Sequence, residues 1–242
     1  MAWFFTDKMI HGDEYVFTGE DANHITKALR MSVGERLCLC DKNCVEYDCT
    51  VKSITKSQVT VKIHSKKQCE NEPDVHVTLY QSLTKGDKME MIIQKAVELG
   101  VSEITPVLTR RCISRPDEKG MGKKLVRWQK IALQAAMQSR RGIIPKVNEL
   151  LSFENALNDS QKNDCTLIFY EGGGDSIASV IDKSHKSVGI IIGSEGGFDD
   201  DEVTLALQNG AKCATLGNRI LRAETAPLAA VAVIMFLTGN LG

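Results

Sequence analysis

The 242-residue chain lacks the sequence features of several protein classes. Its longest apolar run, residues 226–237, contains a proline and is shorter than the roughly 20 residues that a membrane-spanning helix needs. The N-terminus is too poor in apolar residues and too soon acidic for a secretory signal, so we expect a cytoplasmic protein. Repeats and low-complexity tracts are absent. With 43% hydrophobic and 25% charged residues, the composition is that of a globular protein.

Several site motifs are missing as well. The sequence contains neither G-x-x-x-x-G-K-[ST] nor G-x-G-x-x-G, which excludes the P-loop and the dinucleotide fingerprint. Its eight cysteines form no C-x-x-C pair, the commonest half of a zinc site. Cys38, Cys40, Cys44 and Cys49 are near enough in sequence to reach one metal, but free thiols are the default in the cytosol. We therefore expect no metal.

Positive charge is concentrated in the middle of the chain. Residues 85–146 carry 14 basic and 6 acidic side chains, whereas residues 147–242 carry 6 and 13. Such a concentration suits the phosphates of a nucleic acid, although a solvated helix face would give the same pattern. The basic residues of its densest part are Arg110, Arg111, Arg115, Lys119, Lys123, Lys124, Arg127, Lys130, Arg140 and Arg141.

The hydrophobic pattern predicts two domains. Short alternating segments at 36–40, 46–51 and 59–63 indicate strands of a small β-rich unit. A polar stretch ending at Pro73 follows and indicates a boundary. We therefore expect domains at 1–72 and 73–242.

The second domain alternates strands with helices, which predicts an α/β fold with a mostly parallel sheet. The apolar runs at 165–170 and 188–192 are unbroken, as in strands covered on both faces. The expected strands are 75–80, 101–108, 165–170, 188–192 and 214–216, and the expected helices are 87–99, 125–139, 202–209 and 226–237.

Two loops follow strands of this sheet, where parallel sheets bind ligands. The first, 193–198, is glycine-rich, but the acids after it would repel a phosphate at the next helix N-terminus. The second, 216–227, places Arg219, Arg222 and Glu224 beside the most apolar helix of the chain. Buried charges there need partners. A plain turn in the first loop and structural ion pairing in the second remain alternatives.

At this point the sequence resembles a known family. Segments 85–107, 127–147, 191–198 and 216–231 look like the RsmE family, 16S rRNA uridine N3-methyltransferases of the SPOUT class, and 24–41 resembles its PUA-like barrel. The resemblance implies an N-terminal PUA-like β-barrel that binds RNA and a C-terminal SPOUT domain with a trefoil knot. It also implies a homodimer, S-adenosylmethionine in the knot loops, and 16S rRNA, within the 30S subunit, as substrate.

The resemblance also implies roles for individual residues. Arg222 is expected to stabilise charge on the uracil oxygens, and Glu195 or Glu224 to accept the N3 proton. Residues expected at the cofactor are Phe169, Tyr170, Glu171, Gly193, Ser194, Glu195, Gly196, Gly197, Leu216, Gly217, Ile220, Leu221, Arg222, Thr225 and Ala226. Residues expected at RNA are Trp3, Arg30, Arg110, Arg111, Arg115, Arg140 and Arg141.

The chain departs from the family pattern at two positions. Trp3 stands where members usually have arginine, and Gly142 where they often have asparagine. Three other functions stay open: ribose 2'-O-methylation on the same fold, a Rossmann-type methyltransferase using Tyr170–Gly174, and an RNA-binding module without affinity for S-adenosylmethionine.

Overall fold

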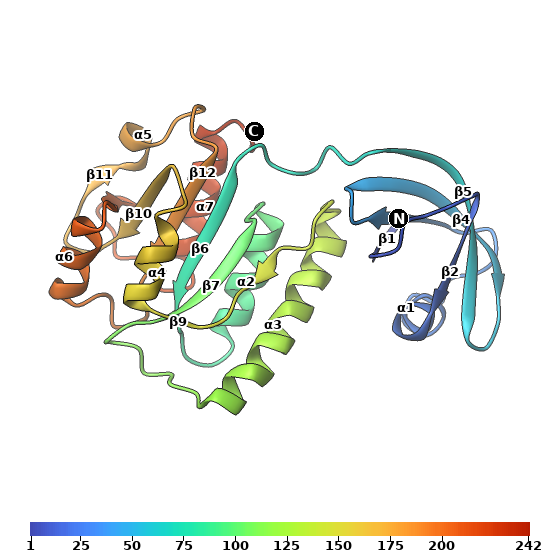
Figure 1. The fold of residues 1–242 in the computed structure, drawn as a ribbon, viewed down its shortest axis with the longest axis horizontal. Coiled ribbons are helices and arrows are strands. Elements are labelled where there is room, and N and C mark those ends of the chain that lie inside the picture. Colours follow the sequence, from blue (N-terminus) through green and yellow to red (C-terminus); the bar gives the residue numbers. More distant parts are fainter. The chain divides into compact units, whose positions relative to one another are not determined.

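The computed structural model describes residues 1–242 and divides into two compact units (Figure 1). Unit 1 comprises residues 1–72 and 136–144, and unit 2 comprises residues 73–135 and 145–242. The segment 136–144, which holds the last turn of helix α3 (Glu118–Ser139), thus belongs with the N-terminal residues. No helix has both the length and the apolar character needed to span a membrane.

Unit 1 is built on a five-stranded sheet of order β1-β3-β4-β5-β2. Only the β1–β3 pair is parallel. Phe4, Phe17, Leu37 and Leu39 are buried in its core because alternate residues of the strands face inward. The three predicted strands are confirmed, and β1 and β2 are additional. The elements are β1 (Ala2–Thr6), β2 (Glu14–Thr18), α1 (Gly19–Asn23), the π-helix η1 (His24–Ala28), β3 (Arg36–Asp41), β4 (Val45–Ile54) and β5 (Gln58–Gln68).

Unit 2 contains an eight-stranded sheet in which every pairing is parallel, as predicted. Its order is β11-β13-β10-β12-β6-β7-β8, with β9 also paired to β7. The five strands expected from the apolar runs are present. The strands are β6 (His76–Ser82), β7 (Glu103–Leu108), β8 (Lys146–Val147), β9 (Leu151–Ser152), β10 (Cys165–Phe169), β11 (Asp175–Ser176), β12 (Ser187–Ile192) and β13 (Lys212–Thr215).

Helices cover both faces of this sheet (Figure 1). Helices α4 (Phe153–Ser160) and α6 (Asp200–Gln208) pack on the face that carries Tyr80 and Ile191. Helices α2 (Lys88–Glu98) and α7 (Ala226–Leu237) pack against each other on the other face, and α7 packs against β6 and β12. The short helix α5 (Ile177–Val180) follows β11. Because all strand pairings of this sheet are parallel, the carboxyl ends of its strands lie at the same edge of the sheet.

Helix α3 differs from the sequence prediction in its start, and α1, η1, α4 and α5 were not predicted. Helix α3 begins at Glu118 rather than at 125, and the Asp117 carboxylate accepts a hydrogen bond from Gly120 N at 2.8 Å near its start. Helix α4 was not predicted, because its polar sequence FENALNDS gives a short apolar stripe. Ser152 caps it by accepting a hydrogen bond from Asn155 N.

Candidate active site

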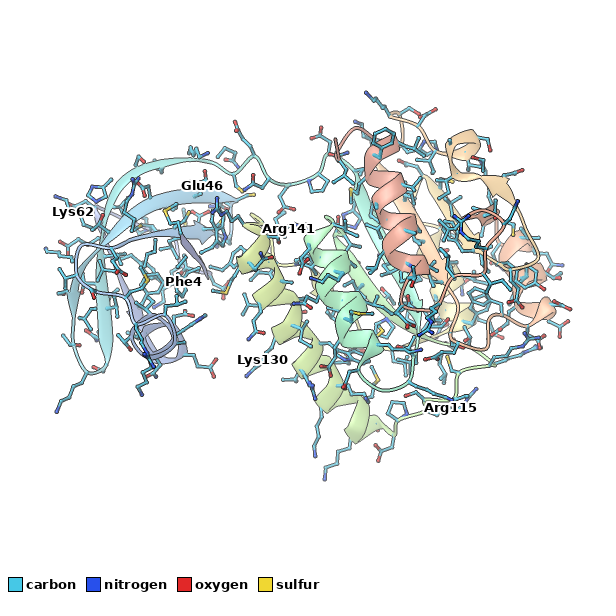
Figure 2. The ribbon with its side chains drawn as sticks, turned by 180° about the vertical axis from the view of Figure 1, so that it is seen from behind. Phe4, Glu46, Lys62, Arg115, Lys130 and Arg141 are labelled. Carbon is cyan, nitrogen blue, oxygen red and sulfur yellow. The ribbon has the colours of Figure 1, made fainter.

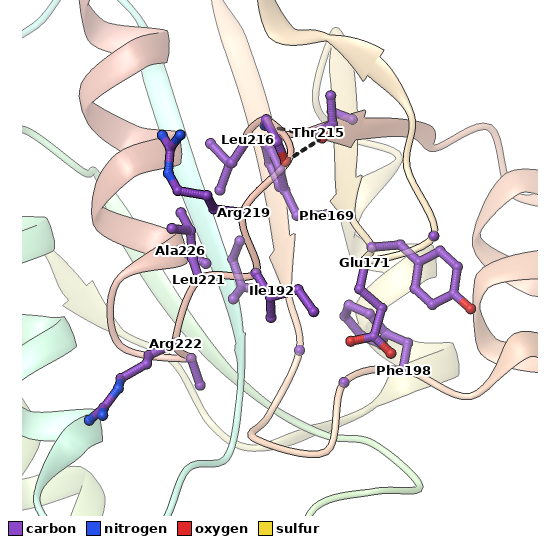
Figure 3. A pocket seen from close by; sticks show the side chains of 18 of the residues that line it. Phe169, Glu171, Ile192, Phe198, Thr215, Leu216, Arg219, Leu221, Arg222 and Ala226 are labelled. Atoms are coloured by element: carbon purple, nitrogen blue, oxygen red, sulfur yellow. Dashed lines mark hydrogen bonds between the residues drawn. The ribbon is translucent and has the colours of Figure 1, made fainter.

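A cavity of about 580 Å³ lies at the carboxyl ends of β10, β12 and β13 (Figure 3). Three loops line it, within residues 169–173, 193–198 and 214–226, and Lys88 of α2 contributes from the side. Parallel sheets bind ligands at this position because loops converge there with free main-chain groups. The structure brings all predicted cofactor residues to the cavity wall except Gly196 and Thr225.

The second and third of these loops owe their shape to glycine. Gly197 has φ of +66°, which a residue with a side chain rarely adopts, and its N–H donates to Ser194 O at 3.0 Å to close a tight turn. Gly217 has φ of +95° just after β13, and its N–H donates to Thr215 Oγ1 at 3.1 Å. Backbone groups can therefore approach a ligand closely in both loops.

The cavity combines apolar walls with one free carboxylate. Phe169, Ile192 and Leu221 line it with carbon surface. The Glu171 side chain lies on one side, and Arg219 and Arg222 lie on the other (Figure 3). No hydrogen bond or ion pair engages the Glu171 carboxylate. The arrangement suits an organic ligand that has both an apolar ring and a positive charge.

Two predicted catalytic glutamates meet at a lysine that sequence reasoning missed. Lys88 Nζ lies 3.1 Å from Glu195 Oε1 and 3.1 Å from Glu224 Oε2. Arg222 Nη1 lies 3.9 Å from Glu224 Oε1, with the Arg222 side chain 84% exposed. The signal available in the sequence is the position of Lys88 at a helix N-terminus, where a positive charge is unfavourable.

Both glutamates are held in the charged form. Burial raises the pKa of Glu195, but N–H donors of the main chain and Lys88 outweigh it, so that pKa lies below its usual value. A main-chain N–H bond and Lys88 also lower the pKa of Glu224, and hydrogen bonds to both carboxylates raise the pKa of Lys88. A lowered pKa makes each carboxylate a weaker proton acceptor.

The glycine loop 193–197 is held by neighbouring segments. Gln81 Nε2 donates to Gly193 O at 3.3 Å, and Ser194 Oγ donates to Arg111 O at 3.3 Å. Arg111 Nη1 donates to Gly196 O at 3.2 Å. The loop therefore keeps its shape through contacts outside the cavity.

The acids that follow this loop cap helix α6. Asp199 and Glu202 form a capping box, in which Glu202 Oε2 accepts from Asp199 N at 3.0 Å. Glu202 Oε1 accepts from Arg110 N at 2.8 Å, and the Arg110 guanidinium pairs with Asp199 and Asp201. The acids thus stabilise a helix start.

The three predicted RNA-contacting arginines of unit 2 all make contacts within the protein. Arg110 pairs with acids and Arg111 binds Gly196 O, as described above. Arg115, which lies in the loop before α3, donates to three main-chain oxygens, including Thr109 O at 3.1 Å and Arg110 O at 3.0 Å (Figure 2). Their side chains therefore shape the loop that supports residues 193–197.

The predicted RNA-contacting residues of unit 1 divide into buried and exposed ones. Trp3 is only 5% exposed and packs with Cys38, Cys40 and Cys69, so its ring has no open face for a base. Arg141 is 4% exposed and paired with an acid. Arg30 and Arg140 are exposed, with φ of +52° and +57°.

The departures from the family pattern lie together in unit 1. A Cβ atom on Gly142 would lie 2.1 Å from Cys44 Sγ and 3.0 Å from Cys69 Sγ, and Cys69 also contacts the cluster that contains Trp3. Gly142 is therefore required by packing. No group of three or more His, Cys, Asp or Glu side chains is placed to hold a metal ion.

Family models match both parts of the chain. An RNA methyltransferase domain matches residues 70–235, and an RNA methyltransferase PUA domain matches residues 17–63. The first match covers more than half of the chain, and the second lies within unit 1.

Proteins similar to this chain are also named as methyltransferases. Ribosomal RNA small subunit methyltransferase E of Bacillus subtilis is 35% identical over 93% of this chain and 90% of its own length. The Neisseria gonorrhoeae protein of that name, solved with S-adenosylmethionine bound, has a TM-score of 0.90 at 31% identity, covering 98% of both chains. A Legionella pneumophila methyltransferase solved with the same cofactor has a TM-score of 0.90 at 30% identity, and the match covers 97% of both chains. This chain belongs to the RsmE family of RNA methyltransferases.

Proposed function

We propose that this protein uses S-adenosylmethionine to methylate N3 of a specific uridine in 16S rRNA of the small ribosomal subunit. Membership of the RsmE family supports methylation of small-subunit rRNA with this cofactor. The observation that carries the proposal to individual residues is the cavity at the carboxyl ends of β10, β12 and β13. The choice of N3 as the acceptor atom follows from the family resemblance.

The cavity fits this cofactor in size and chemistry. Its volume of about 580 Å³ is within the range of pockets that hold molecules of this size. Apolar side chains such as Ile192 and Leu221 suit the adenine ring, and the free Glu171 carboxylate suits an ammonium or ribose hydroxyl group. When bound, S-adenosylmethionine supplies a methyl group already activated by its sulfonium.

The residues of the chain then have to align the acceptor and stabilise its charge. Uracil N3 is buried in a base pair, so the target base must be unpaired or extruded. The exposed Arg222 guanidinium can donate hydrogen bonds to the uracil oxygens as they gain charge. Glu195 and Glu224 remain candidates for the proton acceptor, but their lowered pKa values favour a role in orienting cations.

Exposed basic residues outside the cavity suit the RNA backbone. Lys119, Lys123 and Lys130 of α3 are exposed and have no ion-pair partner, and Figure 2 shows Lys130 on this helix. Arg30 and Arg140 of unit 1 are also exposed. Such contacts position the RNA without specifying its sequence. We assign RNA binding to both units, with unit 1 as the PUA-like RNA-binding domain.

A homodimer is part of the proposal. Helix α7 contains no charged residue, yet Val233 is 38% and Phe236 is 64% exposed, and Ile220 in the preceding loop is 84% exposed. A helix that is apolar all round needs cover on every side. A second copy of this chain supplies that cover. We also propose that the C-terminal domain contains a trefoil knot and that the protein is located in the cytoplasm.

The first test is methyl transfer from labelled S-adenosylmethionine to unmodified 30S subunits and to free 16S rRNA, with the digested nucleosides identified by mass spectrometry. We expect 3-methyluridine. Arg222→Ala should lower the rate by about 10²- to 10³-fold, since it removes a donor to the developing charge. The rate of Arg222→Lys should lie between those of the parent and Arg222→Ala, because lysine keeps the charge but lacks the planar guanidinium that donates two parallel hydrogen bonds.

Three results would overturn parts of the proposal. A ribose-methylated nucleoside would keep the fold and change the acceptor atom. RNA binding without affinity for S-adenosylmethionine would identify a binding module. An Arg222→Ala variant with parental kcat would remove Arg222 from the chemistry.

A further inference from the structure

One lysine connects the two charged loops of the cavity. Lys88 is the first residue of α2, and its Nζ lies 3.1 Å from a carboxylate oxygen of Glu195 and 3.1 Å from one of Glu224. Glu195 belongs to the loop after β12, and Glu224 to the loop before α7. The two carboxylates are thus no farther apart than twice that distance. Without a cation between them they would repel each other.

The two glutamates depend on Lys88 to different degrees. Glu195 Oε1 also accepts a hydrogen bond from Lys85 N at 3.1 Å, so a main-chain group fixes it independently. Glu224 is only 14% exposed, and its other cationic neighbour is Arg222, at 3.9 Å. If Lys88 were absent, Glu224 would be left beside Arg222 alone.

This asymmetry defines a role for Lys88. We propose that Lys88 is a positioning residue that occupies Glu224 and thereby leaves the Arg222 guanidinium free to face the RNA substrate. The inference rests on the proposed function. The 84% exposure of the Arg222 side chain and its 3.9 Å separation from Glu224, longer than a hydrogen bond, are the geometry expected of a guanidinium that is near a carboxylate but not captured by it.

The charge states agree with this role. Hydrogen bonds to Glu224 and Glu195 raise the pKa of Lys88, and Lys88 helps to lower the pKa values of both glutamates. All three groups are therefore charged near neutral pH. A charged Glu224 without Lys88 would attract Arg222 strongly, because a bidentate arginine–carboxylate pair is one of the stronger ion pairs in proteins.

The test compares Lys88→Met, Lys88→Arg and Lys88→Met/Glu224→Gln in the full-length chain. The first readout needs neither cofactor nor RNA: the rate at which phenylglyoxal modifies Arg222, followed by peptide mass spectrometry with Arg219 of the same loop as internal reference. We expect severalfold slower modification of Arg222 in Lys88→Met, because Glu224 captures it. The Glu224→Gln change should restore the parental rate.

The second readout is methyl transfer at saturating S-adenosylmethionine. Lys88→Met should lower kcat by about 10- to 100-fold through misplacement of Arg222. Lys88→Arg keeps both ion pairs and should stay close to the parent. Adding Glu224→Gln to Lys88→Met should recover part of kcat. Lys85→Met is the matched control, since the exposed Lys85 contacts Glu195 only through its main chain.

Several outcomes would overturn the role of Lys88. They are unchanged Arg222 modification in Lys88→Met, no recovery on adding Glu224→Gln, or a loss of cofactor affinity with kcat intact. If the parent protein methylates no RNA, the proposed function fails, and the phenylglyoxal rates alone decide whether Lys88 keeps Arg222 free of Glu224.

Discussion

Arg141 and Glu72 form a two-bond ion pair inside unit 1. Arg141 Nε donates to Glu72 Oε1 at 2.9 Å and Nη2 donates to Glu72 Oε2 at 2.7 Å, with Arg141 only 4% exposed. Glu72 Oε1 also accepts from Gly142 N at 2.7 Å. The pair therefore fixes the segment 136–144 to the N-terminal residues of the same unit.

Removal of one partner should destabilise unit 1. We expect Glu72→Ala to lower the free energy of unfolding by about 3 kcal/mol, because it removes the carboxylate that forms the ion pair with a buried guanidinium. Asp48→Asn removes a comparable pair with Arg36, whose side chain is 66% exposed, and should cost less than about 1 kcal/mol. Urea unfolding measures both. Equal losses would show that burial does not set the strength of the Glu72 pair.

Gly142 should resist even the smallest side chain. Gly142→Ala places a methyl group against Cys44 Sγ and should cost about 1–3 kcal/mol through overpacking. Cys44→Ala in the same chain should recover part of that loss. Gly122→Ala is the control, since its Cβ meets nothing within 4 Å and helix propensity predicts a gain of up to about 1 kcal/mol. Thermal unfolding of the three variants and the parent checks the prediction, and parental stability in Gly142→Ala would contradict it.

The exposed lysines of α3 should govern the salt dependence of RNA binding. Replacement of Lys119, Lys123 and Lys130 by alanine should weaken binding and reduce the slope of log affinity against log salt by about 2, at roughly 0.7 per lost phosphate contact on single-stranded RNA. The control replaces three exposed lysines elsewhere in unit 2, namely Lys183, Lys186 and Lys212. An unchanged slope in the α3 variant would exclude this helix from the RNA interface.

Charge on the apolar face of α7 should prevent self-association. Phe236 is 64% exposed, and Phe236→Asp should convert the proposed dimer into a monomer because a carboxylate cannot be buried in an apolar contact. Leu207→Asp on α6, at a residue that is 48% exposed, should leave the mass unchanged. Light scattering after gel filtration measures the molar mass of the parent and of each variant. A parent that is already monomeric would contradict the dimer.

Acid should remove the contribution that the Asp164 carboxylate makes to the stability of the folded protein at the start of β12. The main-chain N–H groups of Lys186 and Ser187 donate to Asp164 Oδ2 and lower the pKa of Asp164 below its ordinary value of 3.8. Because its pKa is depressed in the folded state, this carboxylate makes its full contribution to folded-state stability above pH 3.8. The contribution is lost as the pH falls through the folded-state pKa. Asp164→Asn should therefore lower the melting temperature at neutral pH and lose this difference in strong acid. A difference independent of pH would assign the effect to packing.

The sequence predicted those elements whose pattern is local. The unbroken apolar runs of β10 and β12 and the apolar helix α7 appear close to their expected positions. Strand β1 was missed because it is stabilised by parallel pairing with β3, more than thirty residues away, which no local pattern records. Helix α4 was missed because few of its residues are apolar.

The candidate site was predictable only in part, for a similar reason. The loops after β12 and β13 were singled out because glycines and charges follow apolar runs. The residues after β10 were expected at the cofactor only because the chain resembles a family. Lys88 lies more than a hundred residues before its partners Glu195 and Glu224, and only the folded chain brings them together. Trp3 and Arg141 were expected at RNA on their residue types, but their burial depends on tertiary packing.

The buried position of Trp3 gives unit 1 its own optical reporter. The chain has two tryptophans, and the other, Trp128, is 3% exposed and belongs to unit 2. Each unit therefore holds a single indole in a dry environment, whose emission moves to longer wavelength when water reaches it. Fluorescence of Trp3→Phe and Trp128→Phe variants can consequently follow the opening of each unit separately in one intact chain.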